Sequence, residues 1–162
     1  MSDYATIEAA ALTLIRGVSS GTVWTAANSI SLANDTTYKA ASLLNSGASD
    51  KYLLLMPGAF TREEMSIGLG NMLERYQVIA QIYVYVRPKS GKAPEAELAA
   101  LREALINRLD AYHQLNGTTG VLYAAVVAGE PIENDTTAAP IVFITQRLVI
   151  AVEVENVNAE VD

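Results

Sequence analysis

The sequence contains no cysteine and a single histidine among its 162 residues. Without cysteine, the chain can form neither a disulfide framework nor a thiolate metal site. A catalytic triad or a histidine-based metal centre would have to be built around His113 alone. Because His113 lies near the expected end of a helix, where an imidazolium interacts favourably with the helix dipole, we favour a structural role for it.

Charged residues are also scarce. They make up 18% of the chain, against about a quarter in an average soluble domain, whereas 51% of the residues are apolar. This composition excludes permanent disorder and indicates that partners cover part of the surface. The net charge of −7 disfavours specific binding of nucleic acid, because a protein that binds phosphate backbones usually has a basic patch.

Long apolar runs are missing as well. The longest one, residues 121–128, is too short to cross a bilayer. The first residues lack the basic region that begins a secretory signal. We therefore expect a soluble protein that has no membrane partner and is made in a cytoplasm.

Motifs that bind cofactors or perform acid–base catalysis are incomplete. Ser90-Gly91-Lys92 lacks the earlier glycine and the Ser or Thr of a phosphate-binding loop. Gly68-Leu69-Gly70 lacks the third glycine of a dinucleotide fingerprint and precedes a strand. Glu63 and Glu64 are adjacent, so their side chains diverge and form no convergent pair of carboxylates. We expect no catalytic residue, no cofactor and no metal.

Two amphipathic helices are expected from apolar residues at three- and four-residue steps. Ser2 or Asp3 can cap the first helix, which ends at Gly17. The second begins at Pro94, followed by acidic residues that suit the positive end of the helix dipole, and Asn116-Gly117 closes it. Each helix has one apolar stripe, which predicts packing against a sheet.

Four strands are expected, at residues 52–56, 76–87, 121–128 and 141–154. Pro57-Gly58 predicts the end of the first strand, and the residues from Ala59 to Arg75 predict a connection. The last strand is unusually long, since strands commonly have about five or six residues. Its length predicts that it projects beyond its sheet or bends at a bulge.

The order of elements defines the expected fold class. Residues 17–50 are rich in Gly, Ser, Thr, Asn and Asp, which predicts a long irregular connection. The chain therefore runs helix, long loop, strand, strand, helix, strand, strand. We expect a single α+β domain over residues 1–162, with an antiparallel-dominated four-stranded sheet and helices packed on one face. Residues 155–162 are expected to form a frayed C-terminal tail.

Three aromatic residues stand out in this pattern. Trp24 lies in the polar connection, and we favour its packing onto the protein's own core over a contact with a partner. Tyr83 and Tyr85 share the mixed face of the second strand. Because a platform for single-stranded nucleic acid would also need a basic groove, we interpret these two tyrosines as a protein contact face.

The layout of the whole chain resembles the tail terminator, or tail completion, proteins of long-tailed bacteriophages. The resemblance covers nearly the whole chain in element order. It is carried by residues 24–32 (WTAANSISL), 54–63 (LLMPGAFTRE), the strand 76–87, the helix from Pro94, residues 120–122 (GVL) and residues 146–153 (QRLVIAVE).

The resemblance implies a structural virion protein with an α+β fold and no catalysis, metal or cofactor. Such proteins form a hexameric ring at the head-proximal end of the tail tube, where they stop further addition of tube subunits. The implied partners are further copies of the chain, the major tail tube protein and a head-completion or connector protein. DNA only passes through the lumen, which suits an acidic protein.

Candidate interface residues follow from the connections, which can present side chains without disturbing a core. Because exposed charges contribute little to stability, reversing the charges at 62–64 is expected to leave the melting temperature nearly unchanged and to impair tail completion. Two alternatives stay open: another ring subunit of a phage neck or baseplate, and a small-ligand-binding α+β domain. The candidate subunit or tail-tube interface comprises Phe60, Thr61, Arg62, Glu63, Glu64, Met65, Arg87, Lys89 and Lys92.

Overall fold

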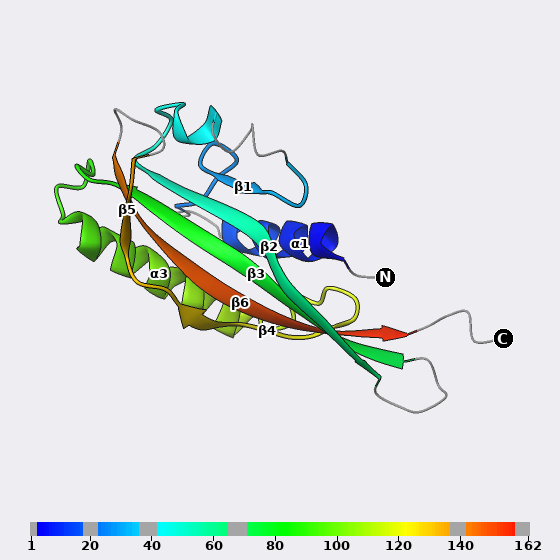
Figure 1. Ribbon diagram of the computed structural model, residues 1–162. Helices are drawn as coiled ribbons and strands as arrows, with labels where there is room; N and C mark the ends of the chain where they lie inside the picture. The colour runs from blue at the N-terminus through cyan, green and yellow to red at the C-terminus, as the bar shows by residue number, and fades with distance from the viewer. Residues whose placement is uncertain (1–2, 18–22, 36–41, 65–70, 137–141, 158–162) are drawn as a thin grey trace.

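The computed structural model describes residues 3–17, 23–35, 42–64, 71–136 and 142–157. Helix α1 (Tyr4–Arg16) and helix α3 (Pro94–Ala111) pack against one mixed β-sheet, and residues 42–44 are also helical (Figure 1). The predicted α+β class is confirmed. No helix in the described part of the chain is both long and apolar enough to cross a membrane.

The described sheet has six strands, in the order β1-β2-β3-β6-β4, and β5 pairs with the first residues of β6. The sheet is antiparallel-dominated as predicted, with one parallel pair, β1–β2. The predicted number of four strands is wrong, because β1 and β5 were missed. Each of these two strands has three residues, too few for a periodic pattern in the sequence. The strands are β1 (Ser29–Ser31), β2 (Lys51–Glu64), β3 (Asn71–Tyr85), β4 (Val121–Gly129), β5 (Glu133–Asp135) and β6 (Phe143–Val157).

Both predicted helices are confirmed, but the predicted end of the second at Asn116-Gly117 is wrong, because α3 ends at Ala111. The Asp3 side chain caps α1 by accepting a hydrogen bond from the Thr6 backbone N–H at 2.8 Å, and Gly17 follows the last residue of the helix. Helix α3 begins at Pro94 and ends at Ala111, so His113 lies just beyond it. The apolar stripe of α3 is buried through Leu98, Leu101, Leu105 and Leu109.

Two apolar clusters lie on opposite faces of the sheet. The main cluster joins α1 and α3 to one face, to which β3 contributes Val78, Ala80, Ile82 and Val84. Trp24 belongs to this cluster and is 5% exposed, so its predicted packing onto the protein's own core is confirmed. The smaller cluster on the other face contains Ile30, Leu44, Tyr52, Leu54, Tyr83 and Phe143.

The central strands are much longer than typical strands. β2, β3 and β6 have 14, 15 and 15 residues, and in Figure 1 they extend past both helices. The predicted connection from Ala59 to Arg75 is wrong, because its described residues 59–64 and 71–75 belong to the antiparallel pair β2–β3. Residues 155–157, predicted to lie in a frayed tail, are the last residues of β6.

Candidate subunit interface

The predicted interface residues separate into two groups at opposite ends of the sheet. Phe60 to Glu64 lie on a projecting part of the sheet that we call the arm, made of residues 60–64, 71–76 and 152–157. Arg87, Lys89 and Lys92 follow the last residue of β3, at the other end of the sheet. Met65 lies outside the described residues. The two groups therefore do not form one continuous site.

The arm begins at a β-bulge. The pairing register between β2 and β3 shifts between Pro57 and Phe60. Because β1 pairs only with residues 53–55 of β2, the strand has a free edge at Pro57. A bulge at such an edge accommodates proline, which cannot donate a backbone hydrogen bond, and this is why Pro57-Gly58 does not end the strand. A Cβ atom on Gly58 would lie 2.7 Å from the Gln77 carbonyl oxygen, so the close approach of the two strands requires glycine.

Helix α1 holds the base of the arm. The Tyr4 hydroxyl lies 2.8 Å from the Gly58 carbonyl oxygen and 2.7 Å from that of Ala59, either of which can accept its hydrogen. The Tyr4 ring makes an edge-on contact with Tyr76 at 4.9 Å, and Phe60 packs against Tyr76 at 5.0 Å. Burial, assisted by the charge of the neighbouring Glu74, raises the pKa of Tyr76 to about 12.

The bulge also changes which side chains of β2 face the helices. Before it, Tyr52 and Leu54 point away from α1 and α3, into the smaller cluster. After it, Phe60 points toward the helices, and Thr61 pairs with Arg75 on the opposite face. Because of the extra residue, odd-numbered side chains of β2 after the bulge lie on the same face as even-numbered side chains before it.

Ion pairs join the three strands of the arm on both of its faces. On the helix side, Arg62 Nε lies 3.3 Å from the Glu74 carboxylate, whose side chain is 3% exposed. On the other side, Arg75 binds Glu63 at 3.0 Å and Glu153 at 3.3 Å, and all three side chains are exposed. Arg62 is exposed as expected, but its partner is a buried carboxylate, so the expectation that reversing its charge leaves the melting temperature nearly unchanged does not apply to Arg62.

Sequence reasoning missed Glu74, Arg75 and Glu153. A signal for two of them is present, because Arg62-Glu63-Glu64 and Glu74-Arg75 have complementary charges on either side of a glycine-containing segment. Opposite charges in this arrangement favour an antiparallel pair. Glu153 could not be assigned from this signal, because its contact with Arg75 depends on the register of β6.

The other end of the sheet contains a cavity of about 230 Å³, which we call the basic pocket. Tyr52, Tyr85 and Phe143 contribute apolar surface, and Arg87 and Lys89 contribute positive charge. The three rings are packed edge-on, with Phe143 5.8 Å from Tyr52 and 6.2 Å from Tyr85. The remaining lining residues are Leu44, Gly47, Ser49 and Asp50.

The charges around the basic pocket have different partners. Asp50 accepts a hydrogen bond from the Lys89 backbone N–H at 2.7 Å and lies 3.9 Å from Lys51. By contrast, the side-chain cations of Arg87, Lys89 and Lys92 form no ion pair with another described residue. These three predicted residues are therefore available to an acidic partner.

Tyr83 and Tyr85 do not form the exposed contact face that the sequence predicts. Tyr83 is 6% exposed, and its ring lies 6.0 Å from Phe143 in an edge-on contact. Tyr85 is half-buried and lines the basic pocket. Of the two tyrosines, only Tyr85 is accessible to a partner, at the basic pocket.

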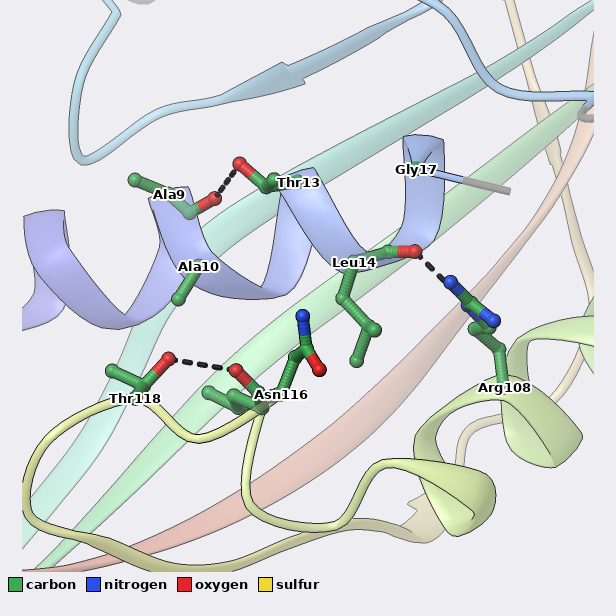
Figure 2. Close-up of a pocket in the computed structure, with 9 residues that line it drawn as sticks. Ala9, Ala10, Thr13, Leu14, Gly17, Arg108, Asn116 and Thr118 are labelled. Carbon is green, nitrogen blue, oxygen red and sulfur yellow. Dashed lines mark hydrogen bonds between the residues drawn. The ribbon is translucent and has the colours of Figure 1, made fainter. Parts of the chain in front are cut away.

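A larger cavity, of about 470 Å³, lies between α1 and the turn that follows α3 (Figure 2). Its wall on α1 consists mainly of small side chains such as Ala9 and Ala10. Arg108 reaches its edge, where Nε donates to the Leu14 carbonyl oxygen at 3.0 Å, as Figure 2 shows. The Thr118 hydroxyl donates to the backbone of Leu115, so these polar groups are already engaged within the chain.

Glu8 is a carboxylate buried between α1 and the segment that contains β1. Its Oε1 accepts hydrogen bonds from the Ser31 hydroxyl at 2.9 Å and the Ala33 backbone N–H at 3.3 Å. Oε2 has no hydrogen-bond partner among the described residues, and burial raises the pKa of Glu8 above its ordinary value. In the described part of the chain, no group of three His, Asp or Glu side chains lies close enough to hold a metal ion.

Comparisons with known proteins add no family to this picture. No model of a protein family matches the chain, and no curated protein matches it. The arm and the basic pocket are therefore the features from which a function can be argued.

Proposed function

We propose that the chain is a structural subunit of a phage virion and acts as a tail terminator. A homohexameric ring of the chain caps the head-proximal end of the tail, binds the last ring of the major tail tube protein and stops tube polymerisation. The opposite face of the ring receives the head-completion or connector protein. The ring assembles in the host cytoplasm, and DNA passes through its lumen without specific binding.

The observation that carries this proposal is the arm. Along residues 60–64, β2 pairs with β3 on one side, and no described strand pairs with its other edge. An open strand edge is a common site of contact between chains, because its backbone N–H and C=O groups can pair with a second strand. The arm thus gives the subunit a projecting surface suited to assembly.

The different chemistry of the two edges of the sheet also supports a ring. The arm part of β2 has mainly polar and charged residues, whereas β4, at the other side, exposes Leu122, Tyr123 and Val127 by 40%, 48% and 58%. A contact between unlike patches on neighbouring copies closes into a ring when the rotation between copies permits. A terminator moreover needs two different ring faces, so that it binds a tube on one side only.

Deletion of the gene from a phage that encodes the chain tests this proposal. We expect tails of excessive and variable length that fail to join heads, and expression of the chain in trans should restore both properties. Electron microscopy of negatively stained particles measures tail length and head joining. Tails of normal length that fail to join heads would assign the chain to another ring of the neck, and fully normal virions would exclude both roles.

A further inference from the structure

The basic pocket and the arm have opposite charges. Residues 86–93 contain Arg87, Lys89 and Lys92 and no acidic residue, which gives this segment a formal charge of +3. The arm contains two arginines and five glutamates, a formal charge of −3. Opposite charges of this size favour association of two surfaces and fix their relative orientation.

The arm also presents an apolar side chain between two carboxylates. Leu73 of β3 pairs with Glu63 of β2 on one side and with Glu155 of β6 on the other. Side chains of directly paired residues point to the same face of a sheet. Leu73 is half-buried and the Glu63 side chain is 63% exposed, so this row of three residues, the arm cluster, can reach a partner.

We propose that the arm cluster of one copy docks into the basic pocket of a second copy. Leu73 enters the cavity beside the ring of Tyr85, and Glu63 and Glu155 pair with Arg87 and Lys89. The occupant is a second copy, because a rigid β3 separates the two surfaces within one chain. The ten residue steps from Arg75 to Tyr85 span about 33 Å at the usual rise of about 3.3 Å per residue.

This contact joins unlike surfaces, so each copy uses its arm cluster toward one neighbour and its basic pocket toward the other. The inference rests on the proposed function, to which it adds the residues that hold neighbouring subunits of the ring together. A cavity of about 230 Å³ suits one large apolar side chain, and the cations at its edge suit the flanking carboxylates.

Charge reversal on each side tests the contact in the purified full-length chain. The pocket variant carries Arg87→Glu and Lys89→Glu, and the arm variant carries Glu63→Lys and Glu155→Lys. Each variant alone brings like charges together, so we expect its self-association to weaken at least about tenfold, as measured by sedimentation velocity. An equimolar mixture restores opposite charges at every contact and should associate as the wild-type chain does.

A matched control keeps the test specific to the contact. Glu103→Lys with Asp110→Lys changes the net charge as the arm variant does, at exposed positions of α3, and should leave association unchanged. Thermal melts identify any variant that has lost its fold. Wild-type association in either reversed variant, or no recovery in the mixture, would overturn the proposal.

Crosslinking tests the contact even when association is weak. Because the natural sequence has no cysteine, Glu63→Cys in one chain and Lys89→Cys in another form a disulfide without background from native thiols. We expect this pair to crosslink at least about tenfold faster than Glu103→Cys mixed with Lys89→Cys. Equal rates would refute the contact.

These measurements use the purified chain alone, so they are independent of the tail assay. A chain that ends tails but shows no such crosslink refutes the contact and leaves the terminator role intact. A chain that crosslinks as expected but whose deletion leaves virions normal refutes the terminator role and leaves the contact. Loss of tail-tube binding in the pocket variant without loss of self-association would assign the pocket to the tube protein and overturn the proposed contact.

Discussion

Replacing Arg62 by methionine should destabilise the protein, because Arg62 neutralises a carboxylate that is removed from water. The Glu74 residue is 2% exposed, and its carboxylate lies 3.3 Å from Arg62 Nε. Removing one partner of a fully buried ion pair costs about 3 to 5 kcal/mol. Since the Arg62 side chain is 49% exposed, solvent screens the pair, and we expect a loss of about 1 to 3 kcal/mol.

Urea unfolding followed by tryptophan fluorescence measures this loss. Trp24 is the only tryptophan and is buried in the main cluster, so its emission reports unfolding of the protein. Glu63→Gln is the matched control, because Glu63 is on the same strand with an exposed side chain, and we expect no measurable change. Adding Glu74→Gln to Arg62→Met should recover part of the lost stability, because it removes the buried charge.

Two results would refute this reasoning. The first is an equal effect of Arg62→Met and Glu63→Gln on the free energy of unfolding. The second is a failure of Glu74→Gln to recover any stability in the double variant. Either result would mean that Arg62 contributes no more to stability than an exposed, solvated charge, as the sequence alone predicts.

Three further predictions concern other parts of the chain. Burial raises the pKa of the Glu8 carboxyl in the folded protein. The neutral form therefore stabilises the fold at a pH below the ordinary pKa of glutamate, and this stabilisation is lost as the pH rises through the raised pKa. Glu8→Gln should therefore raise the melting temperature more at pH 7 than at pH 4, and a pH-independent loss of stability would contradict this assignment. Gly58→Ala should lower the free energy of unfolding by about 1 to 3 kcal/mol, because its Cβ would lie 2.7 Å from the Gln77 carbonyl oxygen. Denaturant unfolding measures this loss, and an unchanged midpoint would show that the strands separate without penalty. The chain should show no measurable affinity for duplex DNA at physiological salt in an anisotropy titration, whereas steeply salt-dependent binding would identify Arg87, Lys89 and Lys92 as a nucleic-acid site.

Much of the body of the fold could be predicted because local signals and tertiary packing agree there. The leucine stripe of α3, from Leu98 to Leu109, is buried as its period indicates. The Asp3 cap forms as its position before an apolar period suggests. Trp24 is an apolar exception in a polar segment, and its burial follows from the size of its side chain.

The arm could not be predicted because its existence depends on distant contacts. Pro57-Gly58 usually ends a strand, but here the bulge and the Tyr4 hydroxyl, more than 50 residues earlier in the chain, hold the strand in place. The pairing of Arg75 with both Glu63 and Glu153 requires the register of three strands. The sequence therefore identified Arg62, Glu63 and Glu64 as interface candidates. It could not show that Arg62 pairs with a buried carboxylate whereas Glu63 and Glu64 are exposed.

The most direct test of the proposed terminator role is the addition of the purified chain to polymerising tail tube protein from the phage whose tail the chain is proposed to cap. Tube lengths and the position of a gold-labelled chain are measured together by electron microscopy. We predict that elongation stops and that the label lies at one end of each tube. Tubes that elongate equally with and without the chain, or label found at both ends or along the sides, would contradict the account.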